Sequence, residues 1–254
     1  MEQTELMELA TKYKERENSS LSEVLIPDGK YLCIRLDGFK GSKRYLKDKM
    51  VNLKFSNTLK YTNDSIFKSF RHYLIQNYSS AIVCSYVVND EISIILNKNN
   101  NHKDAKRIMK LCTLFAGLAS STFSLKFNKK NKTDSFVFDA RPILLDEDEI
   151  SEYIRHRYLF SIRYAYWKAL RLAEVPNAND DDIKGNIDNA IELAIDNDLK
   201  EKSEEAISTY GFYLPQQALK PEYLAIEINK QNMSQDNLDQ YISNYLNYLH
   251  STQR

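Results

Sequence analysis

The chain has 254 residues, of which 43% are hydrophobic and 28% charged, with equal numbers of basic and acidic side chains. This composition is typical of a globular protein and excludes an intrinsically disordered one. No apolar run reaches the roughly 20 residues of a membrane span, and the charged N-terminal stretch does not have the pattern of a signal peptide. We therefore expect a cytoplasmic protein that does not bind a membrane.

Charge is distributed unevenly along the chain. Residues 174–205 contain eleven acidic and three basic side chains, a net charge of −8, so the remainder carries +8. Much of the basic excess lies in segments 40–54 and 102–132. This asymmetry favours a polyanionic ligand on the basic segments. The alternative is that these charges lie on ordinary solvated helix faces.

The cysteines are odd in number and lie in apolar patterns: Cys33, Cys84 and Cys112. None has a second cysteine or a histidine at the spacing of metal ligands. Buried thiols in a reducing compartment are therefore expected, and a zinc site is not.

In the first 145 residues, helical spacing and β-branched runs alternate. After an amphipathic helix over 4–16, the predicted elements are a strand over 31–37, a helix from Asp64 to Leu74, strands over 81–88 and 92–96, a helix over 104–124, and a strand over 135–145 that Pro142 bends or ends. From residue 31 onward this order is strand, helix, two strands, helix, strand. It predicts an α+β fold, a βαββαβ sheet with its helices on one face.

The second part of the chain shows no convincing strand. A long helix is expected over 149–173, a linker over 175–182 and another helix over 183–199. We therefore predict a catalytic sheet domain over 1–145 and a mostly helical region over 146–254 that packs on it.

Two acidic positions stand at the ends of predicted strands. Asp37 leaves the first strand, and Asp90 interrupts the apolar stretch "VVNDEISIIL" at a hairpin turn. In a βαββαβ sheet these two points can meet at one edge, where converging carboxylates would bind a divalent cation. Two Mg²⁺ ions about 3.5–4 Å apart are used for nucleotidyl transfer. The alternative is a pair of ordinary turns, because Asp-Gly and Asn-Asp are common turn sequences.

Four motifs, in order and spacing, carry a resemblance to a known family. They are "IRLDGF" (34–39), "SYVVNDEISIIL" (85–96), "ASSTFSLKFN" (119–128) and "FDARPILLDEDEISEYIRHR" (138–157). Together they resemble the tRNA-His guanylyltransferase family and its bacterial and archaeal relatives over about residues 30–160. The resemblance implies a polymerase-palm-like sheet and addition of nucleotides to the 5′ end of RNA in the 3′-to-5′ direction.

The resemblance also implies roles for particular residues. Asp37, Asp90 and Glu91 would be catalytic, with Asp37, Asp90 and the Gly38 carbonyl binding two Mg²⁺ ions. The implied nucleotide-binding residues are Arg35, Phe39, Lys40, Lys54 and Asn89. The RNA-binding residues expected from the basic segments and the long helix are Lys129, Lys130, Arg157 and Arg163.

The chain also departs from the family. Asn89 stands where the family has Ser, and the stretch after Gly38 is shortened. In the long helix Arg157 matches, but the family's polar Gln, Asp, His and Asn positions are occupied by Tyr158, Phe160, Ile162 and Tyr164. These lost groups belong to nucleotide and tRNA handling, so the metal chemistry is better supported than the usual tRNA-His task.

The long helix keeps a basic stripe, formed by Arg155, Arg157, Arg163, Lys168 and Arg171. Its aromatic residues Tyr158, Tyr164, Tyr166 and Trp167 could stack on bases, although core packing is the expected role.

Three functions agree with these observations. The first is a metal-dependent nucleotidyltransferase that uses GTP or ATP and acts on RNA, in particular tRNA, as a homodimer or homotetramer. The second is a palm-domain nucleotide cyclase or oligonucleotide synthase that makes a small product without RNA. The third is a binding protein without catalysis, against which the presence of both Asp37 and Asp90 argues.

Overall fold

The structure is a computed structural model that describes residues 24–39, 49–73, 82–97, 107–127, 135–208, 211–215 and 223–226, and isolated positions between 237 and 247. Its elements are β1 (Tyr31–Gly38), α3 (Lys49–Tyr73), β2 (Ile82–Val88), β3 (Glu91–Leu96), α4 (Ile108–Phe127), β4 (Phe138–Leu145), α5 (Glu149–Leu172), α6 (Asp181–Gly185), α7 (Ile187–Asp196), α8 (Lys200–Ser208), β5 (Gly211–Pro215) and β6 (Tyr223–Ile226). The helix predicted over 4–16 lies outside the described residues.

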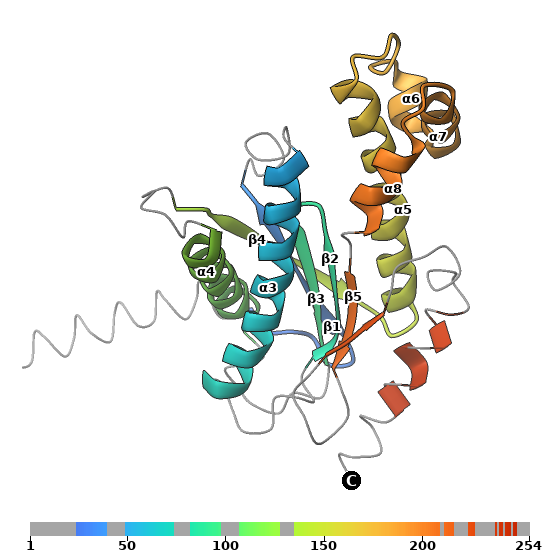
Figure 1. The fold of residues 1–254 in the computed structure, drawn as a ribbon. Coiled ribbons are helices and arrows are strands. Elements are labelled where there is room, and N and C mark those ends of the chain that lie inside the picture. Colours follow the sequence, from blue (N-terminus) through green and yellow to red (C-terminus); the bar gives the residue numbers. More distant parts are fainter. Residues whose placement is uncertain are drawn as a thin grey trace, which may run out of the picture.

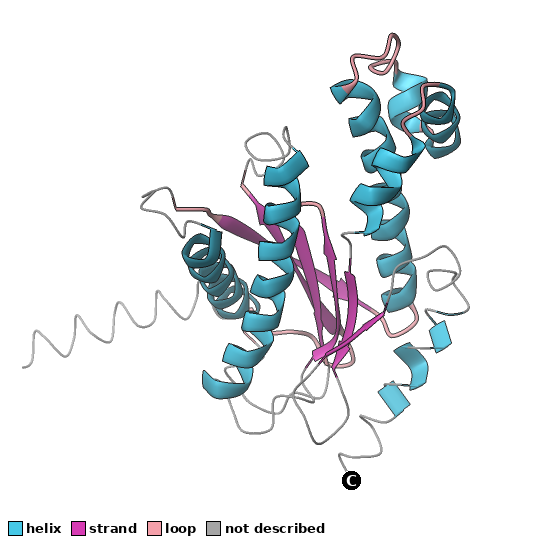
Figure 2. Ribbon diagram, viewed as in Figure 1, coloured by secondary structure: helices cyan, strands magenta, loops and turns pink. Residues whose placement is uncertain are grey.

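The strands form one six-stranded sheet in the order β4-β1-β3-β2-β5-β6, and every neighbouring pair is antiparallel (Figure 2). The predicted order of strand, helix, two strands, helix and strand is confirmed from β1 to β4. The first strand and the hairpin lie side by side, as expected, because β1 pairs with β3.

Helices α3 and α4 cover one face of the sheet (Figure 1). Alternate residues of β1, among them Leu32, Ile34 and Leu36, pack in one apolar cluster with residues of these two helices, such as Phe55 and Phe115. The period-2 alternation of the strand and the period-3.6 spacing of the helices bring these apolar side chains together.

The other face of the sheet packs against α5 (Figure 1). Tyr31 and Cys33 of β1 belong to a second cluster with Ile154 and Ile162 of α5, and α7 and α8 pack on α5 in turn. All three cysteines are buried free thiols, as predicted. The sheet thus lies between two helical layers, and the C-terminal helices do not extend the first layer.

The prediction that no strand follows residue 147 is wrong. β5 and β6 extend the sheet beyond β2, and Ser85, Tyr86 and Val87 of β2 pair with β5. The two strands have five and four residues, which is too short for a recognisable alternation. Tertiary pairing with the edge of β2 determines their conformation.

Pro142 does not end β4, which continues to Leu145 with Pro142 opposite Ile34. Proline is tolerated there because β4 is an edge strand, with β1 as its one partner in the sheet. The predicted helix over 183–199 is also corrected: Asn186 separates α6 from α7, and its side chain accepts a hydrogen bond from the backbone N–H of Asp188.

Helix α4 overturns the expectation that no segment is apolar enough to span a membrane. Among the described residues, α4 is the one helix that is long and apolar enough to cross a membrane by length and composition. Its residues Leu111, Cys112, Phe115, Ala119 and Phe123 are buried in the cluster against the sheet. This packing accounts for the apolar side chains on the face toward the sheet, whereas Met109, Leu114 and Leu125 are exposed.

Candidate active site

Three carboxylates are aligned across neighbouring strands at one edge of the sheet, namely the edge formed by the end of β1 and the starts of β3 and β4. Asp37 of β1 stands opposite Glu91 of β3 on one side and opposite Asp139 of β4 on the other. Residues directly opposite in antiparallel strands project from the same face. The three side chains therefore share one face, which is the face of α5 because Arg157 of that helix pairs with Glu91.

Asp90 lies beside this row in the β2–β3 turn. Its carbonyl oxygen accepts a hydrogen bond of 2.8 Å from the backbone N–H of Gly38. Asn89, the preceding turn residue, has φ 49°, a left-handed conformation that asparagine tolerates well. The end of β1 and the turn that carries Asp90 are thus held together by the backbone.

Gly38 permits this close approach. A Cβ atom at this position would come within 2.7 Å of the Phe136 ring and 3.2 Å of the Asp90 carbonyl oxygen. The Phe136 ring is itself fixed against Phe123 of α4, with the ring centroids 4.5 Å apart. A larger residue at 38 would therefore push β1 and the turn apart.

Arginines neutralise the row of carboxylates. The Arg157–Glu91 pair is nearly buried, with side-chain exposures of 8% and 16%. Arg141 of β4 is more exposed, and its Nη2 lies 3.1 Å from the Asp139 carboxylate and 3.7 Å from that of Asp37. Arg35 precedes Asp37 by two residues and so faces the same side of the sheet. Its Nε is buried and has no hydrogen-bond partner among the described residues.

The arginines offset only part of the cost of burying these negative charges. Burial raises the pKa of Asp37, and the Asp139 carboxylate raises it further against the opposing effect of Arg141. Burial also raises the pKa of Glu91, and the nearby charges of Arg157 and Arg35 offset this only in part. Additional positive charge at this edge would therefore stabilise the ionised forms.

A lysine of α5 lies within electrostatic range of the turn. Burial lowers the pKa of Lys168 to about 8, although the negative charge of Asp90 opposes this shift. Lys168 thus places a positive charge within electrostatic range of Asp90 from a helix that is remote in sequence.

Other predicted site residues are spread over the molecule. Lys54 lies on α3, on the opposite side of the sheet, where its Nζ donates a 2.9 Å hydrogen bond to the Phe127 carbonyl at the end of α4. Phe39 follows β1 and is 59% exposed. Arg163 is farther along α5, with its guanidinium 4.7 Å from the centroid of the Phe160 ring. Lys40, Lys129 and Lys130 lie outside the described residues.

Sequence reasoning missed Asp139, Arg141 and Lys168 as site residues. The alternation along "FDAR" places Asp139 and Arg141 on one face of a strand, but it does not say which strand is the neighbour. The register of β4 with β1 supplies that information. Lys168 was predicted as part of a basic stripe, and nothing in the sequence indicated its electrostatic interaction with Asp90.

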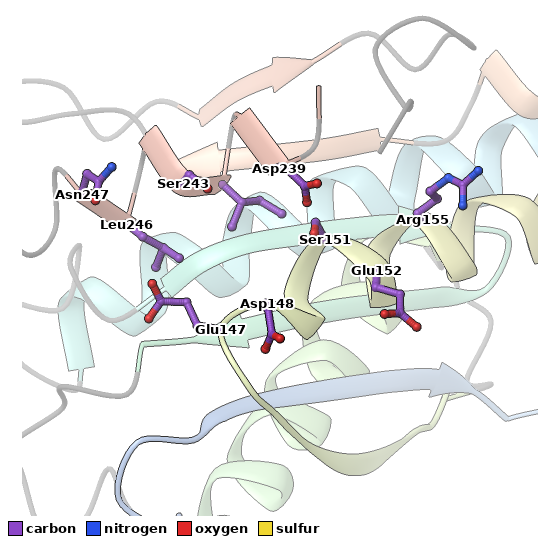
Figure 3. A pocket seen from close by; sticks show the side chains of 10 residues that line it. Glu147, Asp148, Ser151, Glu152, Arg155, Asp239, Ser243, Leu246 and Asn247 are labelled. Carbon is purple, nitrogen blue, oxygen red and sulfur yellow. The ribbon is translucent and has the colours of Figure 1, made fainter. Parts of the chain in front are cut away.

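A cavity of about 1000 Å³ lies elsewhere, between the start of α5 and the C-terminal segment. Figure 3 shows its polar lining, which includes Glu147, Asp148, Glu152 and Asp239. Glu147 accepts a hydrogen bond from Tyr31 at the start of β1, whereas Asp37 is near the end of that strand. The cavity is therefore separate from the row of carboxylates.

The fold and the site together define a class of protein: an antiparallel α+β protein with carboxylates and arginines gathered at one edge of its sheet. The comparisons with known proteins are consistent with that class. The sequence profile of the tRNAHis guanylyltransferase (Thg1) family matches residues 11–146. No curated protein sequence matches the chain.

Solved structures share the fold. A bacterial tRNA(His) guanylyltransferase (Thg1)-like protein in complex with GTP has a TM-score of 0.67 and 16% identity, over 92% of this chain and 99% of its own. The same description applies to a complex with ATP, with a TM-score of 0.69, 16% identity, and coverage of 92% and 98%. The tRNA(His) guanylyltransferase of Saccharomyces cerevisiae has a TM-score of 0.56 and 20% identity, with coverage of 85% and 96%.

The chain belongs to the tRNAHis guanylyltransferase family, because the family profile covers more than half of its length. Members of this family are nucleotidyltransferases, so the protein is an enzyme of that class. The resemblance inferred from the four sequence motifs is thereby confirmed.

Proposed function

We propose that this protein adds nucleotides to the 5′ end of an RNA, tRNA or tRNA-like, in the 3′-to-5′ direction. The observation that carries the proposal is the row of Asp37, Glu91 and Asp139 at one edge of the sheet. At the same edge, a backbone hydrogen bond from Gly38 to Asp90 holds the β2–β3 turn against the end of β1. The GTP and ATP complexes of proteins with the same fold support a nucleoside triphosphate as the second substrate.

The residues at this edge are suited to Mg²⁺. No group of three His, Cys, Asp or Glu side chains with metal-binding geometry occurs in the described part of the chain. Mg²⁺ needs no such group, because it uses one or two protein carboxylates and completes its shell with water and substrate phosphates. The raised pKa of Asp37 marks a carboxylate that an added cation would stabilise. Asp37, Asp90 and the Gly38 carbonyl would hold two ions, which when bound neutralise charge on the reacting phosphates.

The protein's own groups have separate tasks in this scheme. Glu91 remains a proposed catalytic residue with Asp37 and Asp90. Its ion pair with Arg157 also helps to hold the turn, whose Asp90 carbonyl accepts a hydrogen bond from the end of β1. Arg35 binds the triphosphate, together with Arg141, whose exposed guanidinium projects beside Asp37. Phe39, Lys40, Lys54 and Asn89 remain proposed nucleotide contacts. Lys129, Lys130 and Arg163 remain proposed RNA contacts, whereas Arg157 is buried against Glu91 and is reassigned from RNA binding to holding α5 on the sheet. We further propose a cytoplasmic homodimer or homotetramer.

The test is transfer of label from α-labelled GTP or ATP, separated by thin-layer chromatography, with and without tRNA and Mg²⁺. We expect Mg²⁺-dependent labelling of the RNA that persists when its 3′ end is blocked by periodate oxidation. Asp37→Asn should abolish labelling, whereas Asp196→Asn, an exposed carboxylate of α7, should not.

Other outcomes would contradict the proposal. A small labelled nucleotide formed without RNA would indicate the cyclase or oligonucleotide synthase instead. Loss of labelling after periodate treatment would indicate addition at the 3′ end.

A further inference from the structure

From Tyr153 to its end, α5 has an unusual composition for a helix that is exposed on one side. Between Tyr153 and Leu172 it contains no acidic residue and five basic ones, Arg155, Arg157, Arg163, Lys168 and Arg171. A solvated helix is usually stabilised by Glu–Lys or Asp–Arg pairs three or four residues apart, and these cannot form within this segment.

The structure divides the aromatic residues of α5 into two groups. Tyr158 and Tyr166 are only 5% exposed and belong to the core, as expected from the sequence. Phe160 is 39% exposed, and Tyr164 and Trp167 are half-buried and outside both core clusters. Core packing therefore accounts for the first group. The second group lies outside the core clusters, although the Trp167 Nε1 donates a 2.9 Å hydrogen bond to the carbonyl oxygen of Ala178.

The second group lies against arginines in two successive sets along the helix. The Arg163 guanidinium lies 4.7 Å from the Phe160 ring centroid, and that of Arg157 lies 5.0 Å away. The rings of Tyr164 and Trp167 are 5.6 Å apart, and the Arg171 guanidinium is 4.9 Å from the Trp167 ring. We name Phe160, Arg163, Tyr164, Trp167 and Arg171 the α5 ladder.

The ladder begins at the candidate active site and leads away from it. Arg157 anchors α5 to Glu91, and α5 then continues beyond the ends of the strands (Figure 1). From Phe160 to Arg171 the ladder spans roughly 16 Å at 1.5 Å per residue. A different side of α5, with Ile162, Tyr166 and Leu170, packs with α7 in the core. The acidic segment 174–205 therefore lies beside the ladder and would repel a polyanion from that flank.

We propose that the α5 ladder is a stacking platform for unpaired bases of the RNA substrate next to its reacting end. Aromatic rings and arginine planes stack on any base, and arginines neutralise phosphates at the same time. This combination suits single-stranded RNA, whose bases expose their faces, better than a duplex. The inference rests on the proposed function for its RNA substrate, but it assigns a binding surface that can be measured without catalysis.

The fluorescence of Trp167 tests the proposal directly, because it is the single tryptophan of the chain. The wild-type protein is titrated with a single-stranded RNA oligonucleotide, without Mg²⁺ or nucleoside triphosphate. We expect saturable quenching by the single strand and much weaker quenching by a blunt RNA duplex of the same length. Equal quenching by strand and duplex, equal quenching by GTP or ATP alone, or no quenching would overturn the platform.

Variants separate stacking from charge. Phe160→Leu and Tyr164→Leu keep an apolar helix-forming residue but remove the ring, and each should weaken binding of single-stranded RNA on the order of tenfold. For both ring variants, the slope of log affinity against log salt concentration should equal that of the wild type. Arg163→Gln should instead reduce that slope by about one phosphate contact.

Leu159→Ala is the matched control, because Leu159 is equally 39% exposed on α5 but is not part of the ladder. Circular dichroism establishes that each variant keeps its helix. If the ring variants bind RNA as tightly as the wild type, the platform is overturned. The proposed function still stands in that case if the protein labels RNA. Ladder-dependent binding without any nucleotide transfer would instead retain the platform and reject the proposed function.

Discussion

Asp37 is the residue at which the charges of the site meet. It has an acidic neighbour on each adjacent strand, and Arg141 spans two of these three groups at 3.1 and 3.7 Å. A cation and an arginine can both relieve the repulsion, and Arg141 is exposed enough to turn toward a bound phosphate. Asp37 and Arg141 are therefore expected to act together when substrate arrives.

Replacement of Asp90 by Asn tests whether this residue is structural or catalytic. Asn can keep the turn, so the melting temperature of the free protein should be unchanged or raised as repulsion among carboxylates falls. Nucleotide transfer should fall by orders of magnitude, and the rise in melting temperature with Mg²⁺ and nucleoside triphosphate should disappear. A variant that retains both that rise and turnover would end the metal-site hypothesis.

Replacement of Arg141 by Gln tests the proposed phosphate contact. We expect kcat/KM for the nucleoside triphosphate to fall about 10- to 100-fold, because a hydrogen bond to a charged group contributes about 1.5–3 kcal/mol. Arg155→Gln is the control, because Arg155 is an exposed arginine of α5 that lines the separate cavity. Unchanged kinetics for Arg141→Gln would assign this residue to neutralising Asp139 alone.

At the scale of elements, α5 is attached to the sheet by polar contacts at the site and by apolar contacts elsewhere. The hydroxyl groups of Ser93 on β3 and Tyr153 on α5 are 3.0 Å apart, and Arg157 pairs with Glu91 on the same two elements. The ion pair with Arg157 on α5 thus explains why an acidic residue is tolerated at position 91. An acidic residue that begins a buried strand is stabilised because the helix supplies a buried arginine.

A double-mutant cycle measures this attachment. Glu91→Leu or Arg157→Met alone should lower the free energy of unfolding by about 3–5 kcal/mol, because each leaves a buried charge without its partner. The double variant should recover much of that loss, while its activity should stay low because Asp90 is no longer positioned. Denaturant unfolding measures the stability, and additive losses in the double variant would exclude coupling between the two side chains.

At the scale of the whole molecule, the sheet is completed by a segment distant in sequence. β5 pairs with β2, and Phe212 is fully buried in the cluster that joins the sheet to α5 and α7. The C-terminal region therefore contributes to the sheet as well as to the helical layer, and the two predicted parts of the chain share one core.

Replacement of Phe212 by Ala tests this contribution. The loss of a buried aromatic ring should lower the free energy of unfolding by about 3–5 kcal/mol. Leu172→Ala, at a position that is 56% exposed, should change it by about 0.5 kcal/mol or less. A small effect of Phe212→Ala would mean that β5 is not an integral part of the sheet.

The sequence by itself determined the order of β1 to β4 and the long helix α5, because apolar periodicity is local and continuous in those segments. It also placed Asp37 and Asp90 at strand ends and, through four motifs, indicated the family. Only the tertiary structure determined which side chains lie next to these acidic residues. The cross-strand register brings Asp139 and Arg141 to Asp37, and the packing of α5 brings Arg157 to Glu91. The strands β5 and β6 likewise depend on pairing with β2, because segments of five and four residues carry too little pattern to specify a strand.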